Sequence, residues 1–552
     1  MYRKQLTIFG NTLEELRPVT YRGIYSMHKY WSKKPPNIVA SFIEKFSKPG
    51  DIVLDPFSGY GVSGIEAVRL KRKAIIVDLN PMATFISRNI LNLLSIIEIE
   101  NTFKEIKKRV EQKIHSFYKT RCPHCGSEVI GTHYIHKKGE LRKIWFKCPK
   151  CSKNNKRIEE KTPLTEDIEL YQSFSYDKIP FWYPKNITLY DNSRINARPD
   201  LTIKDFFTAR NLHAASLLYN EIEKINNPEV REFFKFIFTG ALPQMSNMVF
   251  VIKRRGKFGG KESNSREEVG SWVIGYWIPE EHFEINVWQC FESRYRKVMK
   301  GKREVIKLLP RARFGSSFSD LISGRADIII KTHDATNLSF IPNESIDYIF
   351  TDPPHGDRIP YFELSSLWAS WLKLDLDFEN EIVISDAKDR KKDIKDYRER
   401  LYAAFKEMYR VLKPGRYISI AFNNLVDEVW FSIIDIITSI GFELVGVTPM
   451  YYSAGSVVQD TRRGGLKSDF IFTCVKRERP LKPYIYNLYI EEENDIAKYV
   501  AEAIDTIKKT HKQKTAEIKI HHILDIVIPR LIKEGKAFRI SDIIKLSKHY
   551  LR

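Results

Sequence analysis

The chain has 552 residues, more than one ordinary core can bury, so we expect two to four folded units. Lysine and arginine total 90 against 69 acidic residues, and the net charge of +21 suits a polyanionic partner such as nucleic acid, although some thermophile proteins share this composition for other reasons. There is no apolar run of the ~20 residues that a membrane helix needs and no signal-peptide pattern at the start, so we expect a soluble, cytoplasmic protein with no membrane partner.

Short apolar runs at 51–55 and 73–78 flank a glycine-rich turn and a helix-like stretch, which is typical of a βαβ unit. This alternation stops near residue 116 and resumes near 326. Further strands are expected at 347–352, 417–422, 442–448 and 469–476, with a helix at 396–412. The sequence therefore predicts an α/β fold whose largely parallel sheet is interrupted by a long insertion. The tail from about 491 has apolar residues at helical spacing.

The stretch from Asp55 to Gly64 contains a GxGxxG pattern directly after the first strand. Such glycines let the backbone approach a ligand, and the same pattern serves dinucleotides, with an acid such as Asp78 for the ribose. A simple tight turn is the third interpretation. Asp55 would repel a pyrophosphate but suits the ammonium and sulfonium of S-adenosylmethionine, so the pattern favours a methyl donor.

Two CxxC pairs, Cys122 with Cys125 and Cys148 with Cys151, have the spacing of a four-thiolate zinc ribbon. Because four thiolates close the coordination shell of Zn²⁺, we expect a structural metal. His124, His133 and His136 lie close enough in sequence to be alternative ligands. Cys290 and Cys474 stand alone in apolar surroundings and are expected in the core.

The strand at 347–352 runs directly into Pro353, Pro354 and His355, and residues before proline are extended and restricted. Asp352 should therefore lie at the carboxyl end of its strand, in the same crevice as Asp55 and Asp78. A carboxylate and the Pro353 carbonyl at this position could accept the two hydrogens of an exocyclic base amine and help localise its lone pair. Such chemistry depends mainly on positioning and electrostatics, and in a duplex it requires a flipped base.

Together these motifs resemble the amino-directed DNA methyltransferases, which modify N6 of adenine or N4 of cytosine. The stretches DPFSGYGVSGIEA and IIVDLNPMA are similar to motifs I and II of that family, the segment from His28 to Ile43 to motif X, and Asp352–His355 to motif IV. The sequence IPYFELSSLWASWL that follows is similar to zinc-ribbon-bearing members with the order X, I, recognition region, IV. The resemblance implies a Rossmann-like, S-adenosylmethionine-dependent methyltransferase sheet. It also implies a catalytic group of Asp352, Pro353, Pro354 and His355, and donor contacts from Asp55, Phe57, Gly59, Gly61, Asp78 and Asp334.

His355 departs from the family, which usually has Tyr, Phe or Trp at this position. We interpret its imidazole as a substitute platform on which the flipped base stacks. The alternatives are that Tyr361 or Phe362 provides the stacking surface, or that activity is reduced or redirected. Asp334 could equally be a turn or helix-capping residue.

The expected organisation has five parts. Residues 1–115 and 316–480 form the two parts of the methyltransferase domain, 116–160 the zinc ribbon, 161–315 a target-recognition insertion, and 481–552 a helical tail. Within the insertion, 253–261 is basic and glycine-rich, as suits phosphate contacts, but could be a solvated loop. The aromatic stretches 181–186 and 271–279 are more typical of a core than of a base-stacking surface.

The sequence therefore predicts an enzyme that methylates N6 of adenine in double-stranded DNA, because Asp-Pro-Pro is commoner on adenine enzymes. The alternatives are an N4-cytosine DNA methyltransferase, an RNA N2-guanine methyltransferase, and a DNA-binding protein on a decayed scaffold. The resemblance also implies a restriction–modification or defence context with a nuclease or other defence partner. The sequence contains no nuclease constellation that we could defend.

Overall fold

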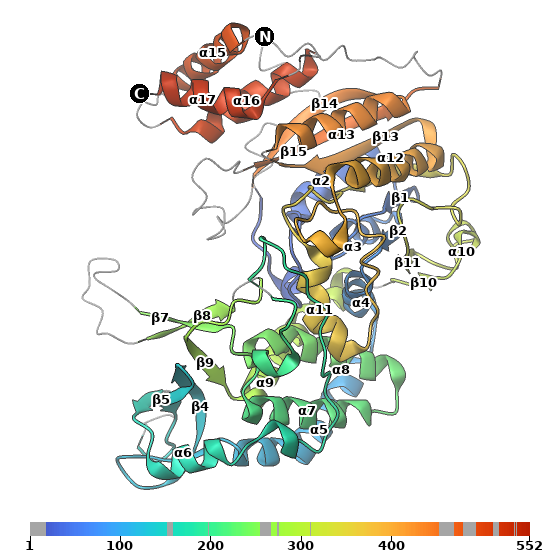
Figure 1. Cartoon of the computed structure of the whole chain (residues 1–552). Coiled ribbons are helices and arrows are strands. Elements are labelled where there is room, and N and C mark those ends of the chain that lie inside the picture. Colours follow the sequence, from blue (N-terminus) through green and yellow to red (C-terminus); the bar gives the residue numbers. More distant parts are fainter. Residues whose placement is uncertain are drawn as a thin grey trace.

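The computed structural model describes residues 18–151, 158–196, 198–253, 267–272, 275–309, 311–424, 426–451, 468–478, 493–511, 518–534, 536 and 538–551. Its described part is a mixed α/β structure built on two sheets (Figure 1). The larger sheet has the order β10-β11-β2-β1-β12-β13-β15-β14, in which β15 is antiparallel to both of its neighbours and the other pairings are parallel. Its strands are β1 (Ile52–Asp55), β2 (Lys73–Asp78), β10 (Phe314–Gly315), β11 (Ile328–Thr332), β12 (Ile346–Thr351), β13 (Leu412–Phe422), β14 (Phe442–Tyr451) and β15 (Ser468–Lys476).

This sheet is buried on both faces, which explains why its central strands are continuous apolar runs. Successive residues point to opposite sides, so Val53 joins one hydrophobic core and Leu54 the other. The first core includes α2 (Pro36–Phe46), α3 (Val62–Arg69) and α4 (Pro81–Leu91), and the second includes α12 (Ile394–Val411) and α13 (Asp427–Ile440). The mixed α/β architecture is consistent with a methyltransferase fold.

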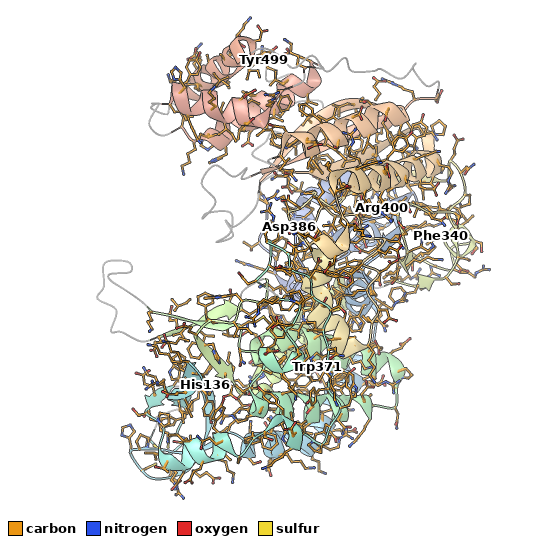
Figure 2. All side chains as sticks on the ribbon, viewed as in Figure 1. His136, Phe340, Trp371, Asp386, Arg400 and Tyr499 are labelled. Carbon is orange, nitrogen blue, oxygen red and sulfur yellow. The ribbon has the colours of Figure 1, made fainter. Side chains whose placement is uncertain are left out.

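The insertion between β2 and β10 shares the first of these cores. It contains a second sheet of order β6-β5-β4-β9-β7-β8, with β3 paired to β4, and a group of helices (Figure 1). Trp371, near the end of α11 (Tyr361–Leu372), packs edge-on against Tyr219 of α7 and lies 5.0 Å from the ring of Phe238 of α8, so α11 joins the insertion to the larger sheet (Figure 2). The strands of the second sheet are β3 (Lys119–Arg121), β4 (Glu128–Lys137), β5 (Glu140–Phe146), β6 (Glu159–Lys161), β7 (Val249–Ile252), β8 (Glu268–Trp272) and β9 (Glu281–Ile285), and the helices of the insertion are α5 (Ile96–Ser116), α6 (Thr165–Gln172), α7 (Ala209–Glu223), α8 (Pro228–Ala241) and α9 (Val287–Leu308). The short α10 (Phe318–Ile322) follows β10 and contacts β10 and β11 of the larger sheet.

Short 3-10 helices lie in the insertion at η4 (Tyr176–Lys178), η5 (Ile203–Phe206) and η6 (Leu242–Met245). Two more lie outside it, η2 (Gly23–Ser26) before α2 and η7 (Lys388–Arg390) between α11 and α12. The tail contains α15 (Glu493–His511), α16 (Ile520–Lys533) and α17 (Ile540–Tyr550), and its apolar residues join the second core of the larger sheet. Within the described ranges, no single helix is long and apolar enough to cross a membrane; one pair, α4 with α5, meets the length and composition test together but bends by 114°.

Candidate functional site

The glycine-rich turn connects β1 to α3 and requires glycine at three positions. Gly59 and Gly61 have φ of 49° and 84°, a backbone conformation that L side chains rarely adopt, and Gly61 begins the helix as its N-cap. A Cβ on Gly61 would lie 2.5 Å from the Ser87 hydroxyl, and one on Gly64 would lie 2.7 Å from Ile76. The first two glycines therefore shape the turn, and Gly64 allows α3 to pack closely on β2.

Asp55 ends β1 and lies almost fully buried beneath this turn. Its carboxylate accepts hydrogen bonds from the backbone N–H of Phe57 (3.1 Å) and from the hydroxyls of Ser63 and Thr351. Burial raises the pKa of Asp55 from 3.8 to about 7, although these donors act in the opposite direction. The buried carboxylate is therefore poised to become ionised when a cation lies beside it.

Asp78 ends β2, and its two carboxylate oxygens hold the neighbouring backbone. One accepts from the Gly59 N–H at 2.7 Å and the other from the Asn80 N–H at 2.9 Å. Burial raises the pKa of Asp78 to about 6. The Asn80 side chain in turn caps α4 and donates to Ser365 on α11 at 2.8 Å. Asp78 thus fixes the turn that carries Gly59, and it lines the same cleft as Asp55.

Asp352 follows β12 directly, as its position before two prolines predicts. One of its carboxylate oxygens lies 2.9 Å from Lys34 Nζ, which also lies 2.8 Å from Asp469 on β15. Burial alone would raise the pKa of Asp469, but the charges of Lys34, His355 and Arg358 hold it well below its usual range. Lys34 therefore connects two carboxylates and fixes the position of the one at the end of β12.

His355 has a different environment from the one a stacking platform needs. Its Nε2 lies 2.9 Å from the second oxygen of Asp352, and its ring packs edge-on against Phe422 at 4.8 Å. It is not among the residues that line the cleft, whereas both Tyr361 and Phe362 line it. His355 therefore contacts Asp352 and lies outside the cleft lining, and the stacking surface, whether His355, Tyr361 or Phe362, stays a prediction.

One cleft brings together residues from both halves of the larger sheet. The turn from Asp55 to Gly59 forms one side, and Asp78, Asp334 and Asp352 border the same space. Asp334 does two things, since its carboxylate also accepts from the Thr336 N–H at 2.8 Å and so forms a turn. Pro353 is buried, and Pro354 lines the cleft with its carbonyl accepting from the Tyr397 hydroxyl at 2.6 Å. The remaining lining residues are Tyr30, Trp31, Ser32, Lys33, Lys34, Val39, Tyr60, Val62, Ser63, Leu79, Asn80, Ala335, Phe350, Tyr361, Phe362, Asn380, Glu381 and Ile382.

The side chains of this cleft fit a ligand with cationic and hydroxyl groups. The Ser58 hydroxyl is buried at the cleft wall and has no hydrogen-bond partner in the described part of the chain. A Cβ on Gly59 would lie 3.1 Å from the Tyr30 ring, so glycine leaves space between the turn and that ring at the cleft wall. An unsatisfied buried hydroxyl, an ionisable buried carboxylate and an open glycine turn are compatible with an amino-acid moiety attached to a nucleoside.

The four cysteines of the two CxxC pairs lie close together in space. Cys122 and Cys125 follow β3, and Cys148 and Cys151 follow β5. Their sulfur atoms all lie within 4.8 Å of one another, with Cys122 and Cys151 at 3.8 Å and Cys125 and Cys148 at 3.6 Å. Four sulfurs at ~2.3 Å from a tetrahedral Zn²⁺ would be about 3.8 Å apart, so the cluster is compatible with a zinc site.

The three nearby histidines have other partners. His124 pairs with Glu159 and His136 with Glu284, while His133 packs against Trp145. The lone cysteines, Cys290 and Cys474, are buried, as expected.

Lys34, Asp469 and Tyr30 are site residues that the motifs did not single out. Lys34 lies inside the stretch that resembles motif X, directly before two prolines. This position in the sequence was the only feature that could have indicated a role for Lys34 in the site. Asp469 had none. In the basic stretch 253–261, residues 254–261 lie outside the described part of the chain, and so do residues 273 and 274 of the aromatic stretch 271–279. In the other aromatic stretch, 181–186, Tyr183 is buried while Trp182 is 44% exposed.

The comparisons agree with these motifs in part. A family model described as DNA methylase matches residues 10–88 and 346–541, and these two segments carry all of the cleft lining except Asp334 and Ala335. Two crystal structures of one provisionally assigned DNA modification methylase from Thermus thermophilus, the first a selenomethionine form, share 13% and 11% identity. They cover 35% and 40% of this chain and 65% and 92% of theirs, with TM-scores of 0.18 and 0.17, too low to establish a shared fold. In the first case the match spans just under two thirds of the relative's length. No curated protein matches the chain.

Proposed function

We propose that this chain is an S-adenosylmethionine-dependent methyltransferase that modifies N6 of adenine in double-stranded DNA. The observation that carries the proposal is the position of Asp352, which borders the same cleft as Asp55, Asp78 and the glycine-rich turn. The DNA methylase match, which falls on the two chain segments that meet there, supports it.

S-adenosylmethionine supplies a methyl group activated by attachment to a sulfonium. Asp55 provides a buried negative charge for the cationic end of the donor, and the Ser58 hydroxyl offers an additional hydrogen bond. Asp78 accepts from ribose hydroxyls, while Phe57 and Asp334 contact the adenine moiety. Gly59 borders the cleft and lets the backbone approach the donor because it has no side chain, and Gly61 gives the turn the shape that this approach needs.

Asp352 accepts a hydrogen bond from the exocyclic amine of the base, and the Pro353 carbonyl accepts the second hydrogen. Two such acceptors draw the lone pair of the nitrogen away from the ring and make it a better nucleophile. The nitrogen lone pair forms a bond to the methyl carbon while the carbon–sulfur bond breaks, and the electron pair of that bond stays on sulfur as a neutral thioether. The nitrogen then loses one proton, which Asp352 is placed to accept. Lys34 and His355 act as positioning residues, because their contacts with Asp352 fix both of its oxygens.

The same acceptors would serve N4 of cytosine, so the nature of the base is part of the proposal. The four-cysteine cluster holds a structural Zn²⁺ that stiffens the insertion, and the insertion reads the target. The expected setting is a restriction–modification or defence system, with a nuclease or another defence protein as partner.

The test is the transfer of labelled methyl from S-adenosylmethionine to duplex DNA, with RNA in a parallel reaction. We expect label in DNA with the wild type and a loss of about 10²–10⁴-fold with Asp352→Asn. Asp375→Asn is the matched control, because Asp375 is exposed and outside the cleft. Label in RNA alone, or equal label with Asp352→Asn, would contradict the proposal.

A further inference from the structure

A cluster of positive side chains lies beside the cleft, where two distant segments cross. Lys29 and Lys33 come from the segment before α2, and Arg294 and Lys297 from α9. η2, just before Lys29, packs along α9, where a Cβ on Gly301 would lie 2.4 Å from Met27. Lys33 lines the cleft, whereas Arg294 and Lys297 line a separate hollow of about 280 Å³. The cluster thus extends from the cleft wall toward the insertion.

These four cations have no acidic partner within ion-pair distance among the described residues. Lys33 Nζ donates to the carbonyls of Tyr25 and His28, and Lys29 Nζ lies 4.3 Å from the Trp272 ring centroid. Burial and then the neighbouring positive charges lower the pKa of Lys29 to about 8 and that of Lys33 to about 7. Burial and mutual repulsion thus disfavour the charged forms of these two lysines, and a bound anion would favour them.

The lining of the hollow indicates which anion fits. Besides Arg294 and Lys297, the hollow is lined by the polar side chains of His133, Gln244, Gln289 and Ser293, and the lining includes no carboxylate. The two amides and the hydroxyl can donate hydrogen bonds. A guanidinium with flanking amides and a hydroxyl matches the several oxygens of a phosphate group. Lys297 is exposed, so its charge is reachable from solvent.

We propose that Lys29, Arg294 and Lys297 bind backbone phosphates of the DNA strand that presents the target base, with Lys33 adding positive potential at the cleft wall. The inference rests on the proposed function, since a base that enters the cleft leaves its flanking phosphates beside the opening. These contacts set the position of the strand and carry no sequence information.

The test compares Lys29→Gln/Lys297→Gln with the wild type in binding a fluorescent duplex of arbitrary sequence by anisotropy over a salt series. Loss of two phosphate contacts should weaken binding about tenfold near 0.1 M salt. It should also make the negative slope of log association constant against log salt concentration shallower by about 1.8. The matched control is Lys108→Gln/Lys307→Gln, which removes two exposed lysines outside the cluster; Lys307 lies about 15 Å along α9 from Lys297. This control should bind within about twofold of the wild type.

Two more readouts distinguish binding from a structural role. Calorimetric affinity for S-adenosylmethionine should be unchanged, and the Tm of the double variant should be no lower, because repulsion is relieved. A double variant with wild-type DNA affinity and salt slope would overturn the inference, as would one that loses donor binding and thermal stability as well. Tighter binding of RNA through the same lysines would overturn the choice of DNA.

The two proposals fail in different ways. If the wild type methylates DNA and the double variant binds it equally well, only the inference fails. If the wild type neither binds nor methylates DNA, both fail.

Discussion

Replacing Asp55 with asparagine should make the stability of the free protein, relative to the wild type, rise with pH, and it should weaken donor binding. Burial raises the pKa of this carboxyl from 3.8 to about 7. Below pH 3.8 it is protonated in both folded and unfolded chains. Between 3.8 and about 7 the unfolded chain loses a proton that the folded protein keeps, so the folded state is progressively destabilised, and above about 7 the penalty is constant.

Since a tenfold change in proton binding is worth about 1.4 kcal/mol, this penalty is about 2 kcal/mol at about pH 5.5 and about 4 kcal/mol at about pH 8.5. Asp55→Asn has no carboxyl to titrate. Its stability relative to the wild type should therefore rise by about 2 kcal/mol between these pH values, whatever the constant cost of altered hydrogen bonds to Ser63 and Thr351. Denaturant unfolding followed by tryptophan fluorescence at both pH values measures this difference.

Calorimetry supplies the second half of the test. A cationic donor needs Asp55 ionised, so the wild type should bind S-adenosylmethionine at least about tenfold more tightly at about pH 8.5 than at about pH 5.5. Asp55→Asn should bind weakly at both, with any remaining dependence due to Asp78, whose pKa is about 6. A stability difference that does not change with pH, together with unaltered donor affinity, would refute the reasoning.

Three further predictions concern the remaining parts of the site. Lys34→Gln leaves the buried Asp469 and the partly buried Asp352 without the cation between them and should lower stability by about 3–5 kcal/mol. Lys34→Gln/Asp469→Asn should recover most of that loss, and equal melting of the single variant and the wild type would count against this. Elemental analysis of the purified protein should find one zinc per chain. Cys148→Ser should lose this zinc because it removes a cluster ligand, whereas the control Cys474→Ala should retain it. Zinc retained by Cys148→Ser would be inconsistent with a zinc site at the cluster. His355→Ala should lower kcat about 10–100-fold with little change in KM for DNA, because His355 contacts Asp352. Tyr361→Ala should mainly raise the KM for DNA, because Tyr361 lines the cleft. The reverse pattern would indicate that the base stacks on His355.

Much of the larger sheet was predictable because its strands are apolar runs bounded by clear turn residues. The strands expected at 51–55, 73–78 and 347–352 correspond to β1, β2 and β12, and the helix expected at 396–412 is α12. The meeting of Asp55, Asp78 and Asp352 in one cleft followed from a general rule, since the carboxyl ends of neighbouring parallel strands lie at one edge.

The contacts that orient these carboxylates were not predictable, because they depend on tertiary packing. Lys34 and Asp469 are 435 positions apart, and only the placement of β15 beside β13 brings them together. The ring of His355 turns toward Asp352 and Phe422, a rotamer choice that no local pattern encodes. The insertion had a recognisable cysteine spacing but no periodic motif that would position its second sheet. The domain boundaries proposed from the sequence stay predictions.

The central claim is that this cleft methylates the N6 amine of adenine in DNA. Its most direct test is mass spectrometry of nucleosides from duplex DNA incubated with the protein and methyl-deuterated S-adenosylmethionine. We expect deuterated N6-methyladenine with the wild type and none above background with Asp352→Asn. Label on N4 of cytosine, or unlabelled DNA from folded protein that binds the donor, would contradict N6-adenine methylation by this cleft.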